Sequence, residues 1–107
     1  MRTALEAEFA LNIELAGTGG GVPLVMLHGF TGSSRAWGRF GELLAVAGPV
    51  LTVDVVGHGE SDAPASIEHY RMAAAVDDVV AAVTKAGFPR ANWLGYSMGG
   101  RLALQIA

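Results

Sequence analysis

The sequence predicts an α/β fold in which a mostly parallel sheet carries helices on its faces. Strand-like and helix-like hydrophobic patterns alternate along the chain, which is typical of parallel strands joined by crossover helices. Several of the strand-like segments are short, continuous apolar runs, as expected of strands that are buried on both faces. With 107 residues, of which 51% are hydrophobic, the chain suits a single domain with its own core, and we assign residues 1–107 to it.

The strands are predicted from their patterns in chain order. Residues 9–15 place Asn12 and Glu14 on one face and large apolar residues on the other, a period of two that indicates a half-buried strand near a sheet edge. Two later segments, residues 22–28 and 49–57, are predicted to be buried strands, and residues 91–97 are predicted to form the last strand. In a sheet of this kind ligands bind outside the carboxyl ends of the strands, so we expect the functional residues there.

The first helix is predicted between the second and third strands. Ser33 or Ser34 can cap it, and its apolar residues fall three and four positions apart. Gly48, followed by Pro49, ends it. Two glycines inside the segment weaken the helix by up to about 1 kcal/mol each, so tertiary packing must hold it.

The second helix has a clearer pattern. An apolar stripe runs from Met72 to Val83, with acidic residues early and Lys85 late, an arrangement that suits the helix dipole. Gly87 is placed as a C-terminal cap. Residues 98–107 begin a third helix.

Composition excludes several classes of function. Ten acidic residues against seven basic ones, without a basic cluster, argue against a nucleic-acid partner. The absence of cysteine excludes disulfides, thiolate catalysis and cysteine-ligated zinc, and no other metal site or cofactor is expected. The N-terminus lacks the apolar core of a signal peptide, and the longest apolar run is far shorter than the roughly 18 residues of a membrane span. We therefore expect a soluble cytoplasmic protein without a membrane partner.

The segment Gly95-Tyr96-Ser97-Met98-Gly99 fits G-x-S-x-G at a strand-to-helix junction. In this motif the serine occupies a sharp, strained turn, and the flanking glycines let the strand and the helix pass closely. Ser97 is thus a candidate nucleophile, and the Met98 amide, at a helix N-terminus, can stabilise an oxyanion. Glycine-rich turns of this kind also occur for packing reasons alone, so the pentapeptide leaves both interpretations open.

A second oxyanion donor is expected after the earlier strand that ends in "LHGF", and the Phe30 amide is the candidate. For His28 and His58 we prefer a structural interpretation, in which each ring hydrogen-bonds its own loop. His69 precedes a helix and is expected to be exposed. None of the three histidines is a good general base for Ser97.

The motifs "LHGF", "DVVGHGESD" and "GYSMGG" resemble, in order and spacing, the N-terminal half of the α/β-hydrolase fold. More narrowly, "LHGFTGSSRAW" and "GYSMGGRLAL" are similar to the 2-succinyl-6-hydroxy-2,4-cyclohexadiene-1-carboxylate synthases of menaquinone biosynthesis, which eliminate pyruvate from their substrate. This resemblance implies that Ser97 is catalytic and that Tyr96 and Arg101 bind a carboxylate-bearing small molecule. The chain departs from the family at Val56, where a proline is common, which affects loop stiffness and nothing catalytic.

The place of Arg101 agrees with that implication. A helix brings residue i+4 back over residue i, so Arg101 is expected near Ser97. A guanidinium grips a carboxylate with two hydrogen bonds, which suits a polycarboxylate substrate. The alternative is an arginine paired with an acidic neighbour on the helix surface.

In the α/β-hydrolase family the triad follows the order serine, acid, histidine, yet residues 98–107 contain neither an acidic residue nor a histidine. We therefore expect a truncated hydrolase fold that is inactive alone and whose last strand, 91–97, has an exposed edge prone to self-association. Three functions remain open: a synthase of the menaquinone pathway, a general carboxylesterase-like serine hydrolase, and a non-catalytic fragment.

Overall fold

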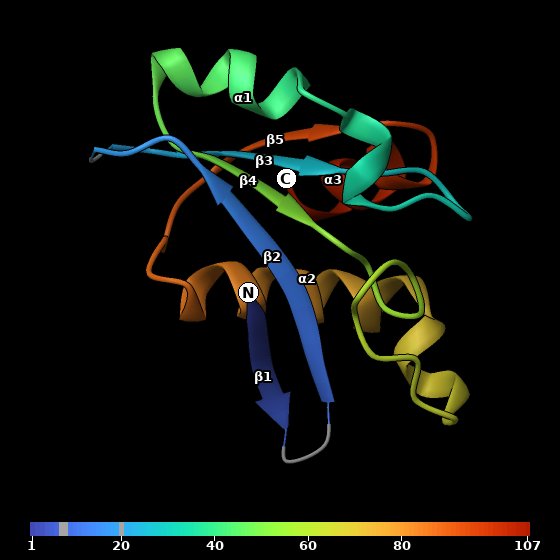
Figure 1. The fold of residues 1–107 in the computed structure, drawn as a ribbon. Coiled ribbons are helices and arrows are strands. Elements are labelled where there is room, and N and C mark those ends of the chain that lie inside the picture. The colour runs from blue at the N-terminus through green and yellow to red at the C-terminus, as the bar shows by residue number, and fades with distance from the viewer. Residues whose placement is uncertain (7–8, 20) are drawn as a thin grey trace.

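A mixed sheet organises the structure, a computed structural model that describes residues 1–6, 9–19 and 21–107 (Figure 1). Within these residues the sheet has five strands in the spatial order β1-β2-β4-β3-β5. Their bounds are Arg2–Glu6 for β1, Phe9–Ala16 for β2, Leu24–Leu27 for β3, Val50–Val53 for β4 and Asn92–Gly95 for β5.

The strands β4, β3 and β5 run parallel, whereas β2 pairs antiparallel with β4 and β1 antiparallel with β2. The predicted α/β sheet with flanking helices is confirmed. The register aligns Leu27 with Val53 on one side and with Gly95 on the other. The carboxyl ends of the three parallel strands therefore lie level, and the residues that follow them meet at one edge of the sheet.

The beginning of the chain differs from the prediction in two ways. Residues 2–6 form a strand that was not predicted; this strand is the edge, and β2 beside it lies near the edge, as predicted. Asn12, predicted on an exposed face, is buried with 4% of its surface accessible. It is buried because the loop after β4 covers that face. The backbone amide of Asn12 donates to Ser61 Oγ at 2.7 Å, and the backbone amide of Asp62 donates to the Ala10 carbonyl at 3.0 Å.

The first helical segment is broken where a continuous helix was predicted. Ser33 does cap it, its Oγ accepting a hydrogen bond from the Arg35 amide at 3.2 Å. Gly38 then adopts a φ of 56°, which a right-handed helix cannot accommodate, and the chain bends there. The segment consists of the 3-10 helix η1 (Ser34–Trp37), the helix α1 (Phe40–Leu44) and the 3-10 helix η2 (Ala45–Ala47), which ends at Gly48 as predicted.

The second helix, α2, spans Met72–Lys85 as predicted, after the short 3-10 helix η3 (Ile67–Tyr70). Gly87, with a φ of 105°, ends α2. Its amide donates to the Thr84 carbonyl at 3.0 Å and the Phe88 amide to the Val83 carbonyl at 3.2 Å. This pair of bonds satisfies carbonyls that the helix end would otherwise leave free. The third helix, α3, spans Met98–Ile106.

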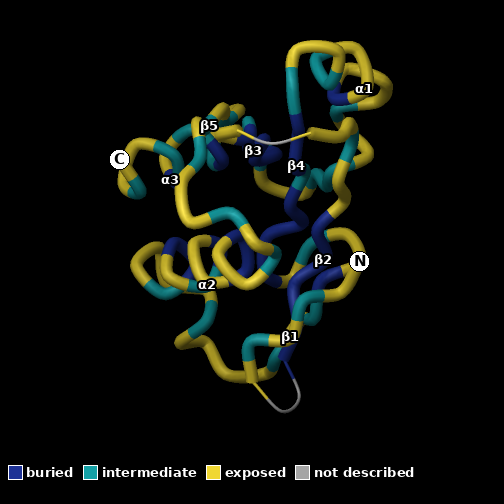
Figure 2. Tube along the Cα trace, turned by 90° about the vertical axis from the view of Figure 1, so that its left-hand side faces the viewer, coloured by how far each residue is buried: buried dark blue, intermediate teal, exposed yellow. Residues whose placement is uncertain are grey.

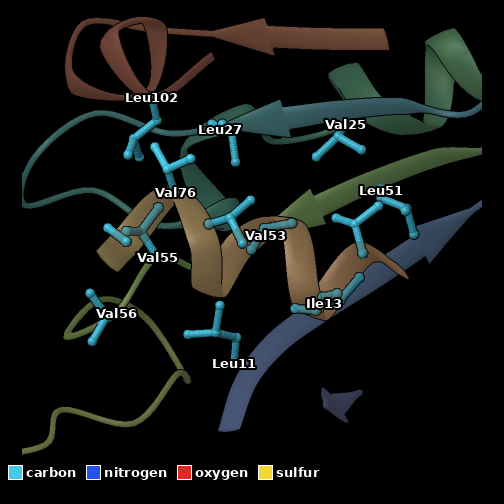
Figure 3. Packing of buried hydrophobic residues seen from close by; sticks show 14 of the residues in the cluster. Leu11, Ile13, Val25, Leu27, Leu51, Val53, Val55, Val56, Val76 and Leu102 are labelled. Carbon is cyan, nitrogen blue, oxygen red and sulfur yellow. The ribbon is translucent and has the colours of Figure 1, made fainter. Parts of the chain in front are cut away.

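The helices cover both faces of the sheet (Figure 1). The segment with α1 lies on the face of β4 that bears Val50 and Thr52, while α2 and α3 contact each other on the opposite face. Figure 2 shows that burial concentrates in the inner strands and on the inner side of α2. Alternate residues of the strands meet the two helices in a single apolar cluster (Figure 3), which includes Leu11, Ile13, Val25, Leu27, Leu51, Val53, Val76, Val79, Val83 and Leu102. This core fixes α3, and with it the turn at its N-terminus.

Candidate active site

The turn between β5 and α3 has the predicted strained geometry. Ser97 adopts φ 55° and ψ −112° at the N-terminus of α3, and among the described residues only Thr31 shares a positive φ without being glycine. Such a backbone costs on the order of 1–3 kcal/mol and persists only where its surroundings enforce it. Here the Tyr96 amide donates to the Leu27 carbonyl at 3.0 Å and the Gly99 amide to the Tyr96 carbonyl at 2.9 Å. The first bond ties the turn to the neighbouring strand β3, and the second closes the turn itself.

Close approach explains the two glycines of the motif. A Cβ atom added to Gly95 would overlap the carbonyl group of Gly99 on the helix. One added to Gly99 would overlap the carbonyl group of Leu27 at the end of β3. Backbone atoms cannot move aside as a flexible side chain can, so β3, β5 and α3 meet this closely only because both residues lack a side chain. The close passage of strand and helix that the motif predicts is confirmed at Gly95 and Gly99.

The amides proposed for the oxyanion lie at two neighbouring chain segments. Met98 is the first residue of α3, and Phe30 lies in the loop that follows β3. Neither amide donates a hydrogen bond to any residue that the structure describes, so both remain available as donors. The Phe30 side chain is 72% exposed at this surface. That the two amides converge on one oxyanion stays a prediction.

Ser97 is exposed, and its hydroxyl has no hydrogen bond to a carboxylate or imidazole within the described residues. His28 is buried and engaged elsewhere: its Nδ1 donates to the Gly29 carbonyl at 2.7 Å, and its Nε2 accepts from the Val55 amide at 3.0 Å. Burial lowers the pKa of His28 despite the bond to Gly29, which raises it. The neutral ring thus joins the ends of β3 and β4.

His58 makes a similar connection between loops. Its Nδ1 donates to the Val56 carbonyl at 2.9 Å, and its Nε2 accepts from the Thr31 amide at 3.1 Å. The ring also lies 5.7 Å from that of Phe30, centroid to centroid, in an edge-on arrangement. The structural interpretation of His28 and His58 is therefore confirmed, and the strained Thr31 is held by His58.

His69 corrects the prediction that it is exposed. Only 20% of its side chain is accessible, its Nδ1 lies 3.2 Å from an Asp78 carboxylate oxygen, and its ring packs 4.3 Å from that of Phe9. Burial raises the pKa of Asp78, and the bond from His69 opposes that rise. The contacts with β2 and α2 leave His69 only partly accessible, and within the described residues no histidine is hydrogen-bonded to Ser97.

Arg101 and Ser97 line the same cavity, an open groove of about 630 Å³ along β5 and α3. The Arg101 guanidinium is exposed and forms no ion pair with any acidic residue that the structure describes. The alternative of a surface ion pair is thus not observed. Tyr96 is 69% exposed, and its ring lies over Gly29, where a Cβ atom would come within 3.1 Å of it. The roles of both residues in substrate binding stay predictions.

Asp54 is a structural residue of this edge that sequence reasoning missed. The Ser34 amide donates to its Oδ1 at 2.7 Å, and the Glu60 amide and the Asn12 side chain donate to its Oδ2 at 3.0 and 3.1 Å. Burial alone would raise the pKa of Asp54, but these hydrogen bonds to the charged form lower it. The carboxylate thus ties two loops to β2. The sequence signal for this role was an acidic residue directly after the apolar segment that forms β4.

Within residues 1–6, 9–19 and 21–107, no group of three or more histidine, cysteine, aspartate or glutamate side chains gathers in a way that could hold a metal ion. The helices of the described chain are all too short or too polar to cross a membrane.

Known proteins share the sequence pattern and the fold of this chain. The sequence profile of the family described as alpha/beta hydrolase fold matches residues 22–107. A Bacillus subtilis (strain 168) protein with a provisional assignment as 2-succinyl-6-hydroxy-2,4-cyclohexadiene-1-carboxylate synthase is 38% identical over 84 residues, covering 78% of this chain and 30% of that protein. The bifunctional epoxide hydrolase 2 of Sus scrofa is 38% identical over 90 residues, covering 83% of this chain and 16% of the hydrolase.

Solved structures show the same similarity. Est816, described as an N-acyl homoserine lactone degrading enzyme, superposes with a TM-score of 0.87 at 31% identity, over 99% of this chain and 39% of its own. The enol-lactonase of Burkholderia xenovorans LB400 superposes with a TM-score of 0.87 at 26% identity, over 98% of this chain and 40% of its own. The chain thus spans 30% or less of the two curated relatives. With its profile match, its strand order and its Ser97 turn, the chain belongs to the α/β-hydrolase fold family.

Proposed function

We propose that Ser97 is the catalytic serine of a lyase similar to 2-succinyl-6-hydroxy-2,4-cyclohexadiene-1-carboxylate synthase, which eliminates pyruvate in menaquinone biosynthesis. The observation that carries the proposal is Arg101. It is a cation without an acidic partner among the described residues, it lies one helical turn after Ser97, and it lines the same groove. The similarity to the Bacillus subtilis protein supports it.

The proposed site divides the chemistry among few groups. Arg101 binds a substrate carboxylate through two charge-assisted hydrogen bonds, and Tyr96 lies beside it on the same turn. The Phe30 and Met98 amides hold negative charge that develops on a substrate oxygen. Ser97 needs a base to act at neutral pH, and the histidines of residues 1–107 are engaged elsewhere. The proposal therefore requires a histidine and an acid beyond those that this chain presents to Ser97.

A general serine hydrolase of the carboxylesterase type is the second candidate. The strained turn, the free amides and the close-packed glycines serve ester or amide hydrolysis equally well. The neighbour named as an enol-lactonase favours this alternative, because a lactone is a cyclic ester. A third possibility, a non-catalytic chain, follows from the absence of a base at Ser97 within the described residues. The cytoplasmic location stays a prediction from composition.

A chimera tests the proposal. Residues 1–107 are joined to the part of the Bacillus subtilis relative that follows its matching segment, and the product is assayed for pyruvate release from the synthase substrate and for hydrolysis of a neutral ester. We expect Ser97-dependent pyruvate release, abolished in Ser97→Ala. Ester hydrolysis without pyruvate release would replace the synthase by the hydrolase. A folded chimera without either activity would leave the non-catalytic role.

A further inference from the structure

Thr31 directly follows the candidate oxyanion residue Phe30 and has a strained backbone. Its φ of 64° is unusual for a β-branched residue, and such a conformation persists only where neighbouring groups enforce it. The Thr31 amide donates to His58 Nε2 at 3.1 Å. The next amide, that of Gly32, donates to the Gly29 carbonyl at 3.0 Å and closes the loop locally. Among the residues that the structure describes, His58 is thus the one side chain that holds the Thr31 backbone by a hydrogen bond.

The two partners of the His58 ring determine where its proton lies. Nδ1 lies 2.9 Å from the Val56 carbonyl oxygen, which can only accept, and Nε2 faces the Thr31 amide, which can only donate. Both bonds form together only when the ring is neutral and carries its proton on Nδ1. A second proton, taken from solvent by Nε2, would point at the Thr31 N–H and leave two donors facing each other. His58 therefore holds Thr31 only in its neutral form.

The groups around His58 show which side chain responds to acid. His28 lies closest, with its ring 5.0 Å away, but it is buried and both its nitrogens are engaged; burial lowers the pKa of His28, and so does the His58 ring. The loop after β4 adds the carboxylates of Asp54 and Glu60, and η3 adds the Tyr70 hydroxyl. The helices α2 and α3 add only apolar side chains to the space that His58 lines. His58 itself is partly exposed, so a proton from solvent reaches it more readily than it reaches His28.

We propose that His58 is a positioning residue for the oxyanion site: its neutral ring holds the loop that carries the Phe30 amide, and protonation releases this loop in acid. The inference rests on the proposed function in so far as Phe30 is an oxyanion donor. Phe30 and Thr31 share a peptide bond, so a change in the Thr31 backbone moves Phe30 as well. The Phe30 ring also packs edge-on against the His58 ring at 5.7 Å. Imidazole suits such a switch, because it is the side chain whose charge ordinarily changes near neutral pH.

An NMR titration of the 107-residue chain tests this contact without any activity. At neutral pH the His58 ring should carry its proton on Nδ1 and none on Nε2. On acidification the Thr31 and Phe30 amide shifts should change with the same midpoint as the His58 ring signals. The Gly99 amide, which closes the Ser97 turn, should not move at that midpoint. A proton on Nε2 at neutral pH, or a Thr31 amide that does not follow the His58 ring, would overturn the proposal.

The variant His58→Gln separates the hydrogen bond from the charge. A glutamine carbonyl oxygen can accept from the Thr31 amide, and the glutamine side chain does not titrate. The variant should therefore keep the neutral-pH shift of Thr31 and lose the change in acid. His69→Gln is the matched control, since His69 is also partly buried but bonds to Asp78 instead. A Thr31 transition that persists in His58→Gln, or that disappears in His69→Gln, would contradict the role of His58.

The catalytic consequence is measured on the chimera, for whichever of its two assayed reactions depends on Ser97. His58→Leu removes the acceptor at every pH, so it should lower kcat about ten-fold or more and leave KM within about two-fold, because an oxyanion donor acts in the transition state. His58→Gln should restore most of that kcat. In acid, log kcat/KM of the parent should fall with a slope of about two, one proton for the catalytic base and one for His58, and in His58→Gln with a slope of about one.

The outcomes distinguish this inference from the proposed function. A Thr31 transition that follows His58 in a chimera without Ser97-dependent activity would reject the proposed function and retain the release of the loop in acid. Ser97-dependent activity with equal acid slopes in the parent and in His58→Gln would retain the catalytic serine and refute the positioning role of His58.

Discussion

Replacing Ser97 by glycine should stabilise the chain relative to replacing it by alanine. At φ 55° and ψ −112°, any residue with a Cβ atom is strained by on the order of 1–3 kcal/mol, and Ser97→Ala keeps that strain. Glycine removes it, and loses about 0.4–1 kcal/mol through the greater freedom of its unfolded chain. The expected net advantage of glycine over alanine therefore lies between about 0 and 2.6 kcal/mol in the free energy of unfolding, with its centre at about 1.3 kcal/mol.

Ser66 is the matched control, because it too precedes the first turn of a helical segment but has an ordinary φ of −68°. Glycine is better than alanine at such N-terminal positions for reasons of capping alone, and the Ser66 pair measures that contribution. The excess at position 97 over position 66 isolates the strain.

The measurement is urea unfolding of the four variants at low protein concentration, with the slope m compared before stabilities are compared. A difference of about 1 kcal/mol corresponds to roughly 4–8 °C in Tm for a domain of this size. An advantage of glycine that is no larger at position 97 than at position 66 would show that the turn is not strained, and would remove the main structural argument for a nucleophile there.

Four further outcomes are expected. Gly99→Ala should destabilise the chain by about 2 kcal/mol or more, because the new Cβ would overlap the Leu27 carbonyl group. Gly100→Ala is the control: its Cβ would meet its nearest neighbour at 3.4 Å, so the urea midpoint should change little. In the chimera, Arg101→Ala should lower kcat/KM for a carboxylate substrate roughly ten- to a hundred-fold, because a charge-assisted hydrogen bond of about 1.5–3 kcal/mol is lost. The kcat/KM for a neutral ester should not change. Equal losses for both substrates would mean that Arg101 is structural. Asp54 has a lowered pKa in the folded state, so its contribution to stability is present above the unfolded pKa near 3.8 and is lost as pH falls through the lower folded value. The free energies of unfolding of the parent and of Asp54→Asn should therefore converge at low pH. Parallel curves of stability against pH would contradict the structural role of the Asp54 carboxylate. The 107-residue chain should elute as associated species in size-exclusion chromatography, and Leu94→Lys on the edge strand β5 should reduce the association. A monodisperse parent chain would show that this edge does not promote association.

Local patterns predicted most of the fold, and non-local contacts account for the differences. The Ser97 turn follows from steric needs that five consecutive residues express completely, so it could be predicted. The burial of Asn12 could not, because it depends on Asp54, 42 residues later in the chain, whose carboxylate accepts its side-chain hydrogen bond. The same holds for His69, whose partner Asp78 and whose neighbour Phe9 come from two other elements.

Two further differences have local causes that the sequence shows only weakly. The strand Arg2–Glu6 alternates between exposed and partly buried residues, but its charged ends obscure the pattern, and it forms by pairing with β2. Glycine in the first helical segment was expected to weaken the helix, whereas Gly38 breaks it by adopting a positive φ. Composition alone cannot distinguish these two effects, because glycine permits both conformations at similar cost.

The residues that position Ser97 are different from the histidines that could exchange protons. Everything that positions Ser97 is local to β3, β5 and α3: the hydrogen bonds to Leu27 and Tyr96, and glycines that only backbone contacts explain. The three histidines instead fix the surrounding loops, and two of them hold the segment that carries the Phe30 amide. A base supplied from elsewhere would thus meet a turn that is already in place, since no described group has to leave Ser97 first. Catalysis by Ser97 would then depend on the arrival of a histidine and its acid partner, with the described residues of the turn already in position, which is why the chimera is the decisive test of every activity proposed for this chain.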